Sequence, residues 1–154
     1  MQKLTTAAFV AFGVGAVIGG IATYFVATAI WRSALLTYVD FEVREHEKHA
    51  LHAFVALEPE AALHAQEALA RDLKNKFAAN FVSADTYYRT VGMSKAREGV
   101  ALLLLRKKSL ADERLDEAVA MLRKVNEETP KEVLVSGLLK HRESAKQGPA
   151  TKLK

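Results

Sequence analysis

The sequence predicts an all-α protein in which a single N-terminal transmembrane helix continues as a stalk into a small helical domain. No charged residue lies between Lys3 and Arg32, and an apolar pattern with helical spacing then continues to Leu57. The later residues carry helix start signals and no strand-like alternation. We expect a transmembrane anchor over residues 1–31, a helical stalk over 32–58, a bundle or repeat-like domain over 59–143 and a disordered basic tail over 144–154.

The uncharged run from Leu4 to Trp31 is long enough to cross a bilayer. It contains 28 residues. A helix of that length measures about 42 Å, against a hydrocarbon core of about 30 Å, so it can span the membrane with some tilt. Tyr24, Trp31 and Arg32 lie toward its C-terminal end, as expected for side chains at the headgroup level.

The sequence of this segment and of its flanks indicates whether it is cleaved and how it is oriented in the membrane. Ala27-Thr28-Ala29 fits a signal-peptide cleavage pattern, but the apolar run is longer than the roughly 7–15 residues of a signal core, so we expect an uncleaved anchor. Lys3 and the α-amine nearly balance the cations that follow the run, which are Arg32, Arg44 and Lys48. A very short basic N-terminus is typical of an anchor whose C-terminal domain lies outside the cytoplasm, in a bacterial inner membrane. The slightly basic remainder of the chain favours the opposite orientation.

Small side chains recur at every fourth position along one face of the predicted anchor. They are Ala7, Ala11, Gly15, Gly19, Thr23 and Ala27. Small residues gain nothing against lipid, but they let a second helix approach closely. The pattern therefore predicts intramembrane packing against a helix of another subunit or of a second copy of this chain.

The predicted stalk carries a seam with steps of three and four residues, in which His46 and Ala53 fill the two larger gaps between the expected packing residues. These packing residues are Leu36, Val39, Val43, Ala50 and Leu57. Such spacing places them on one side of a helix. We expect this seam to pack against the later helices of the same chain, and a short coiled coil with a partner is the alternative.

Start signals divide the rest of the chain into four helices. Pro59 suits the first turn of one helix, and Ser94 is the expected cap of the next, which runs through Val100–Leu105. We expect Ser109 to begin a third helix and Thr129-Pro130 to begin the last. The six consecutive apolar residues from Val100 to Leu105 predict that the second of these helices is the most buried.

One stretch resembles a known repeat family. The spacing of Ala118, Leu122, Val125 and Pro130 is similar to the second helix of a tetratricopeptide repeat and its closing proline. The first-helix positions depart from the family, which prefers tryptophan, Leu-Gly and tyrosine where this chain has Leu102, Leu105, Arg106 and Ser109. The resemblance covers at most residues 83–139 and implies a protein-binding scaffold.

One polar face of the stalk offers possible chemistry. Glu45, His49 and His52 fall on one side of a helix, where imidazole and carboxylate groups could hold a metal ion or respond to pH. The segment His46-Glu47-Lys48-His49 does not match the His-Glu-x-x-His motif of zinc proteases, because the second histidine would have to stand at position 50, which is alanine. We therefore predict no metal site and no cofactor, and Glu45, His49 and His52 are the candidates if a metal binds.

These patterns together predict a non-enzymatic membrane protein that serves as an accessory or assembly subunit. The expected partners are other membrane protein subunits or a second copy, together with membrane lipid. Acidic residues interleave the cations, so we expect no nucleic acid, and no motif indicates a small-molecule substrate. Two alternatives stay open, which are a pH sensor or metal-handling protein using the histidine face, and a membrane-tethered peptide-binding adaptor or chaperone.

Overall fold

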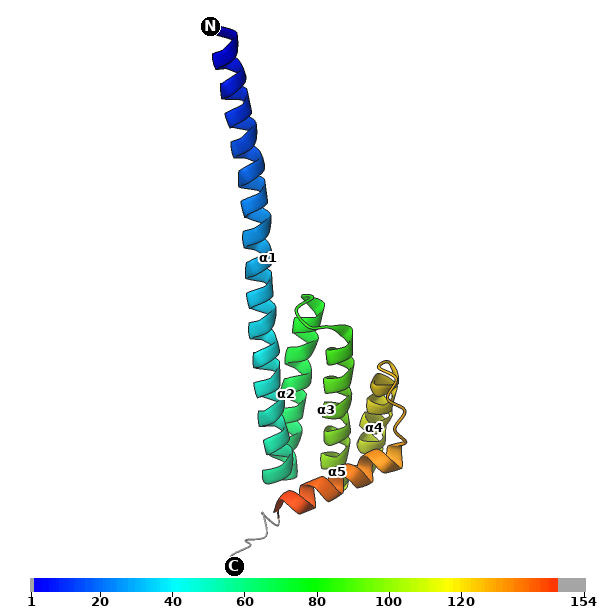
Figure 1. Cartoon of the computed structure of the whole chain (residues 1–154). Helices are drawn as coiled ribbons and strands as arrows, with labels where there is room; N and C mark the ends of the chain where they lie inside the picture. Colours follow the sequence, from blue (N-terminus) through cyan, green and yellow to red (C-terminus); the bar gives the residue numbers. More distant parts are fainter. Residues whose placement is uncertain (1, 147–154) are drawn as a thin grey trace, which may run out of the picture. The chain divides into compact units, whose positions relative to one another are not determined.

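The computed structural model describes the backbone of residues 2–146 and the side chains of residues 19–146. Five helices follow one another in this part of the chain (Figure 1): α1 (Gln2–Ala56), α2 (Pro59–Ala78), α3 (Ala84–Leu104), α4 (Lys108–Arg123) and α5 (Lys131–Lys146). Residues 2–146 contain no strand, so the all-α prediction is confirmed. The chain divides into two compact units, residues 1–38 and 39–154, and α1 contributes to both.

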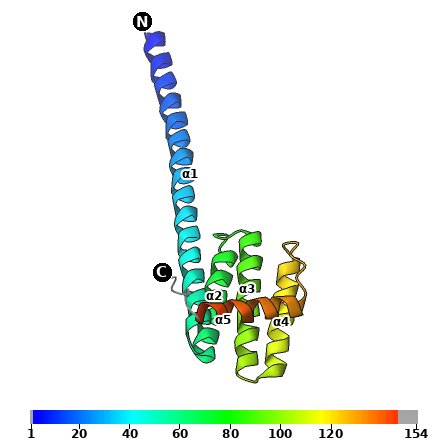
Figure 2. The ribbon, with the colours of Figure 1, turned by 60° about the horizontal axis from the view of Figure 1, so that its bottom comes forward.

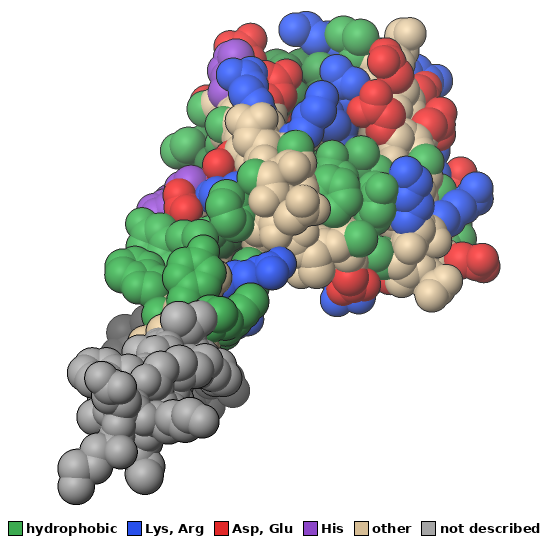
Figure 3. Space-filling model, turned by 90° about the horizontal axis from the view of Figure 1, so that it is seen from above, with side chains coloured by type: hydrophobic (Ala, Val, Ile, Leu, Met, Phe, Trp, Pro, Cys, Tyr) green, Lys and Arg blue, Asp and Glu red, His purple; other side chains and the backbone are tan. Residues whose placement is uncertain are grey.

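The first unit is the N-terminal part of α1. Every side chain described from Gly19 to Tyr38 is exposed, and the large apolar ones include Tyr24, Phe25 and Trp31. Hydrophobic side chains crowd this part of the chain in the space-filling view (Figure 3). No helix within residues 19–146 is both long and apolar enough to cross a membrane. Residues 4–18 of the predicted span lie outside the part whose side chains the structure describes.

The second unit is a helical bundle centred on α3. The last part of α1, from Val39 on, lies in sequence order beside α2, α3 and α4, and α5 crosses one face of this row (Figures 1 and 2). Between Thr90 and Leu102 only Met93 and Lys95 of α3 are not buried. The expected run Val100–Leu105 is only partly buried, because Leu104 at the end of α3 is 43% exposed. Burial thus centres one to two turns earlier than the apolar run predicts.

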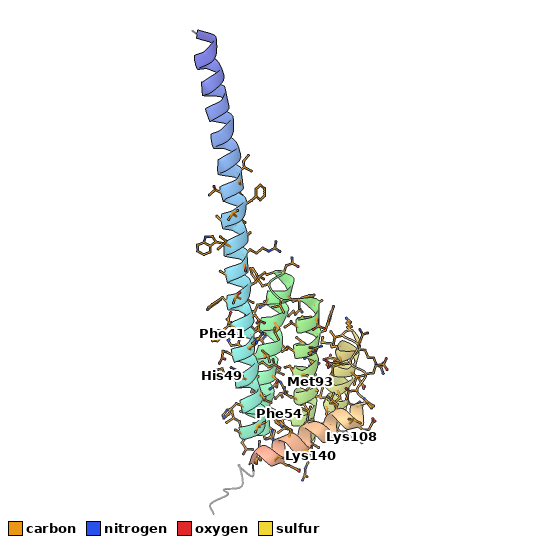
Figure 4. The ribbon with its side chains drawn as sticks, viewed as in Figure 1. Phe41, His49, Phe54, Met93, Lys108 and Lys140 are labelled. Atoms are coloured by element: carbon orange, nitrogen blue, oxygen red, sulfur yellow. The ribbon has the colours of Figure 1, made fainter. Side chains whose placement is uncertain are left out.

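Two apolar clusters hold this unit together. Phe54 of α1 packs with α3, α4 and α5 residues, among them Val100 and Leu138, and Met93 lies against this cluster (Figure 4). The second cluster joins the seam of α1 to α2 and α3 through Val39, Val43, Ala50, Leu69, Leu73 and Val91. Burying apolar area in both clusters supplies most of the stabilisation of such a bundle.

Glycines on α3 permit its close approach to α4. A Cβ at Gly99 would lie 2.6 Å from Cγ of Leu115, and a Cβ at Gly92 would lie 3.0 Å from Cγ of Leu122. These two glycines are seven residues apart, so they lie on the same face of α3. Leucine side chains of α4 fill the space that the missing side chains leave.

A buried polar chain links α1, α2 and α3. The Gln66 side-chain amide donates to the carbonyl oxygen of Ala50 at 2.6 Å, and the Ser94 hydroxyl donates to the carbonyl oxygen of Gln66 at 2.9 Å. Arg97 is also buried, and its Nε and Nη1 atoms have no hydrogen-bond partner among the described residues. Burial lowers the pKa of the Arg97 guanidinium, and the charge of Glu47 opposes this effect.

Three of the expected helix boundaries are wrong. The N-cap of α3 is Ser83, whose hydroxyl oxygen accepts from the Thr86 N–H at 3.1 Å, and Ser94 lies inside the helix. Helix α4 begins at Lys108, with no side-chain cap, so Ser109 lies in its first turn. Helix α5 starts directly after Pro130 and extends to Lys146, past the start of the expected tail. Residues 147–154 of that tail lie outside the described residues.

Helices α2, α3 and α4 end in the same way. Asn80, Arg106 and Asn126 follow them with φ angles of 58°, 61° and 59°. In each case the next N–H bonds five residues back, as from Phe81 to the Lys76 carbonyl at 2.9 Å. The turn after α3 spans residues 105–107, which falls inside the first helix of the tetratricopeptide register. That register is therefore wrong, although α3 and α4 do form a helical hairpin.

Candidate functional site

An open groove crosses the second unit between α2 and α4, with α3 as its floor. Its volume is about 630 Å³. We call it the α2–α4 groove. Its apolar lining consists of Ala70 from α2, Tyr87 and Val91 from α3, and Met121 from α4. The groove thus presents an apolar strip whose members come from three helices.

The groove lies on the side of α3 opposite to α5. Met93 and Val100 of α3 pack with the cluster that includes Leu134 and Leu138 of α5. Positions 87, 91 and 95 line the groove instead, and helical spacing sets them roughly opposite to positions 93 and 100. Helix α5 therefore closes one face of the bundle, and the groove occupies the other.

Lys95 and Arg114 are held at the groove by a buried carboxylate. The Glu98 side chain is fully buried, and its Oε2 atom lies 2.9 Å from Lys95 Nζ and 3.3 Å from Arg114 Nε. Burial raises the pKa of the Glu98 carboxyl, although Lys95 and Arg114 favour its charged form. Arg114 also binds Glu117, with Nη1 3.0 Å from Oε1. The two cations therefore have fixed positions over a buried acid.

The α2 wall of the groove carries two further cations. Arg71 and Lys74 are exposed and three residues apart, so they lie on neighbouring positions of one helix face. Neither makes an ion pair within residues 19–146. Of the two acidic lining residues, Glu117 binds Arg114, and Glu67 lies 3.7 Å from His64. The charged lining residues are thus mostly positive, and two of the cations have no ion-pair partner among the described residues.

Aromatic stacking fixes one end of the groove. The Tyr87 ring lies parallel to the Phe77 ring, with centroids 4.3 Å apart, and it meets the Tyr88 ring edge-on at 5.2 Å. Lys124 Nζ lies 4.4 Å from the centroid of Tyr88. These contacts connect α2, α3 and the end of α4, so Tyr87 is a pre-positioned apolar contact.

Only half of the predicted small-residue face can be placed. Ala7, Ala11 and Gly15 lie outside the residues whose side chains the structure describes. Gly19, Thr23 and Ala27 are exposed on α1, and a Cβ added at Gly19 would meet no atom within 4 Å. The Thr23 hydroxyl donates to the Gly19 carbonyl oxygen at 2.8 Å, which satisfies this polar group within the helix.

The predicted stalk seam divides at Tyr38. Val39, Val43 and Ala50 are buried in the second unit against α2 and α3. Leu36 lies in the first unit and is 37% exposed, and Leu57 follows the end of α1 and is 45% exposed. The central members of the seam therefore pack against later helices of the same chain.

The candidate metal residues do not converge. Glu45 pairs with Lys48, His52 is exposed on α1, and so is His49 (Figure 4). No group of three His, Asp or Glu side chains within residues 19–146 is arranged to hold a metal ion. His49 does line a second, smaller pocket of about 350 Å³, together with His46 and Asp72.

Among the histidines of this part of α1, His46 is the one that makes a polar contact with another helix. His46 Nδ1 lies 3.0 Å from Asp72 Oδ2 of α2, and the same oxygen accepts from Lys76 Nζ at 2.6 Å. Lys76 also reaches Glu42 at 3.2 Å, which closes a network between α1 and α2. Burial tends to raise the pKa of Asp72, but the hydrogen bonds from Lys76 and His46 outweigh it and lower this pKa.

Comparison with known proteins identifies no relative. No protein-family model, no curated protein and no solved structure matches this chain.

The groove was not predicted from the sequence. The pair Arg71 and Lys74 could have been noticed as two cations on one helix face. Lys95 and Arg114 are distant in the sequence, and nothing local indicates that both bind Glu98.

Proposed function

We propose that this chain is a non-enzymatic, membrane-anchored accessory or assembly subunit whose helical domain holds a segment of a partner protein. The observation that carries the proposal is the α2–α4 groove, an open surface with an apolar strip and charged walls. Mixed surfaces of this kind, with an apolar centre and a polar rim, are typical of protein–protein interfaces. A core built from all five helices gives the groove a rigid frame.

The proposed anchor rests on the sequence and on exposure in the first unit. The run Leu4–Trp31 has no charge, and exposed large apolar residues continue from Ile21 to Tyr38. Contiguous apolar surface of this extent marks a protein or membrane contact. Lipid and a partner helix on the face of Gly15 and Gly19 would cover it. We propose that the anchor lies in a bacterial inner membrane, with the domain outside the cytoplasm.

The test is purification of the full-length chain from its native membrane in mild detergent, followed by size exclusion and mass spectrometry. A stoichiometric companion is expected. Gly15→Leu or Gly19→Leu should release an intramembrane partner while membrane insertion stays intact, because leucine prevents close helix approach. Retention of the companion by both variants would contradict intramembrane packing.

A groove-filling variant tests the domain. Ala70→Trp places a large ring in the α2–α4 groove and should release a partner that binds there. Ala120→Trp is the matched control, because Ala120 is an exposed residue of α4 outside the groove lining. Equal recovery of the companion with both tryptophan variants would contradict the role of the groove. A transient rather than stoichiometric companion would favour the peptide-binding adaptor or chaperone.

A second candidate function is a pH sensor, and the contact between His46 and Asp72 favours it. Protonation of His46 would strengthen its bond to the carboxylate and thereby the α1–α2 contact. The variants His46→Gln and the pair His49→Ala with His52→Ala separate the bonded histidine from the exposed ones. A pH response of partner binding that His46→Gln removes would support the sensor, and a response unchanged in all variants would dismiss it.

A further inference from the structure

We infer that the occupant of the α2–α4 groove is an acidic, amphipathic segment of a partner protein. This inference rests on the proposed function, since it specifies the chemistry of the segment that the groove holds. Its basis is the juxtaposition of an apolar strip with cations on both sides. Val91 and Met121 belong to the strip, Arg71 and Lys74 stand on the α2 side, and Arg114 stands on the α4 side.

Charge complementarity indicates that the segment bound in the groove is negatively charged. The lining contains four cations, Arg71, Lys74, Lys95 and Arg114, against two acids, Glu67 and Glu117. Glu117 already binds Arg114, and Glu67 has only His64 nearby, at 3.7 Å, whereas Arg71 and Lys74 have no ion-pair partner within residues 19–146. A carboxylate on the partner would complete pairs that the chain leaves open, and a basic segment would meet like charge along the α2 wall.

On the other side of the groove, Lys95 and Arg114 could also bind a carboxylate of the partner. Glu98 lies behind Lys95 and Arg114 and fixes both, so it acts as a positioning residue for two cations. Glu117 forms an ion pair with Arg114 at the groove surface, and the Glu117 side chain is 40% exposed. A partner carboxylate can therefore displace Glu117 from Arg114, while the buried Glu98 keeps the guanidinium in place.

The apolar strip requires a segment with more than negative charge. Tyr87 is held by stacking on Phe77, and Val91 and Met121 follow it along the groove. Apolar side chains with helical spacing would pack on this strip, and acidic side chains on their flanks would face the two basic walls. An extended run of acidic residues alone would leave the strip uncovered.

The experiment uses the full-length chain in detergent and two fluorescent synthetic peptides of equal length. Both carry leucines at helical spacing, and the flanking positions are glutamate in one peptide and glutamine in the other. The glutamate peptide should bind about tenfold more tightly, and its advantage should shrink as salt rises because the pairs are exposed. Equal affinity for the two peptides would overturn the inference.

Charge reversal on the α2 wall locates the site. Arg71→Glu with Lys74→Glu should lower the affinity for the glutamate peptide by about tenfold or more, since two attractions become repulsions. Arg71→Gln with Lys74→Gln should give an intermediate loss. The matched control is Lys108→Glu with Lys140→Glu, which makes the same charge change on exposed residues of α4 and α5 outside the groove (Figure 4). An equal loss in the control would overturn the assignment to the groove.

The outcomes separate this inference from the proposed function. If a companion co-purifies but binds the charge-reversed and wild-type chains equally, the acidic segment is wrong and the accessory role stands. If the glutamate peptide binds as expected but no companion co-purifies, the groove chemistry stands and the accessory role is wrong. Binding of phosphatidylglycerol vesicles through Arg71 and Lys74, with no discrimination between the peptides, would assign these cations to lipid headgroups and overturn the inference.

Discussion

The Arg142 guanidinium lies over the Phe54 ring, 5.5 Å from its centroid, and its Nη1 atom donates to the Phe54 carbonyl oxygen at 2.7 Å. Its Nη2 atom donates to the Leu57 carbonyl oxygen at 2.8 Å. A cation from α5 thus satisfies carbonyl groups at the C-terminal end of α1, where the helix dipole is negative. This contact joins residues that are 88 positions apart in the chain.

Replacing Arg142 should therefore lower the stability of the folded chain. Arg142→Ala removes the donor to the buried Phe54 carbonyl oxygen and to the partly buried Leu57 carbonyl oxygen, together with the cation over Phe54, so we expect a loss of about 2–4 kcal/mol in the free energy of unfolding. Denaturant unfolding of the full-length chain in detergent, followed by circular dichroism, measures this loss. Arg123→Ala, at an exposed residue of α4, should change stability by less than about 0.5 kcal/mol. Similar effects of the two substitutions would contradict the capping role.

Two glycines should respond in opposite directions to alanine. At Gly99 the new Cβ would meet Leu115 at 2.6 Å, so Gly99→Ala should destabilise the chain by about 1–3 kcal/mol through overpacking. At Gly137, inside α5, the new Cβ would meet nothing within 4 Å. Gly137→Ala should stabilise by about 0.5–1 kcal/mol, because glycine is a poor helix former. The midpoint of thermal unfolding should fall for Gly99→Ala and rise for Gly137→Ala. A stabilising Gly99→Ala would refute the close α3–α4 contact.

Arg106 offers a stabilising substitution. Its φ of 61° is unfavourable for a side chain with a Cβ, and glycine is the preferred residue at this position after a helix. Arg106→Gly should raise the free energy of unfolding by about 1 kcal/mol. Asn80→Gly at the equivalent position after α2 should give a smaller gain, because asparagine tolerates this conformation. Equal gains at both positions would show that side-chain type does not matter at these turns.

Glu98 should make stability depend on pH. Burial raises its pKa in the folded state, so the folded chain retains the proton over a pH range in which the unfolded chain has lost it. Stability from this group is therefore present below the ordinary glutamate pKa of 4.5 and declines as pH rises through the folded value. The difference in unfolding free energy, wild type minus Glu98→Gln, should fall as pH rises above the ordinary glutamate pKa. A difference that rises with pH would contradict the assigned direction.

The helical content was predictable because its signals are local. Pro59 begins α2 as expected, and the seam members Val39 and Val43 are buried at the spacing that the sequence shows. Start signals were less specific, because serine occurs both at caps and inside helices. Ser83 caps α3, whereas Ser94 donates a hydrogen bond to α2 from within α3. Which serine caps a helix depends on which backbone groups tertiary packing leaves without partners.

The candidate site was predictable only in fragments. The all-α class, the uncharged N-terminal run and the apolar faces can be predicted from the sequence, since they depend on residue type and on a period of 3.6 residues. Arg71, Lys95 and Arg114 come from three different helices, and they line one groove because of the way these helices pack. The small residues Gly92 and Gly99 let α4 approach α3, and that approach brings Arg114 to Glu98. The order and distance of packed helices depend on contacts between residues far apart in the chain, and no local pattern encodes them.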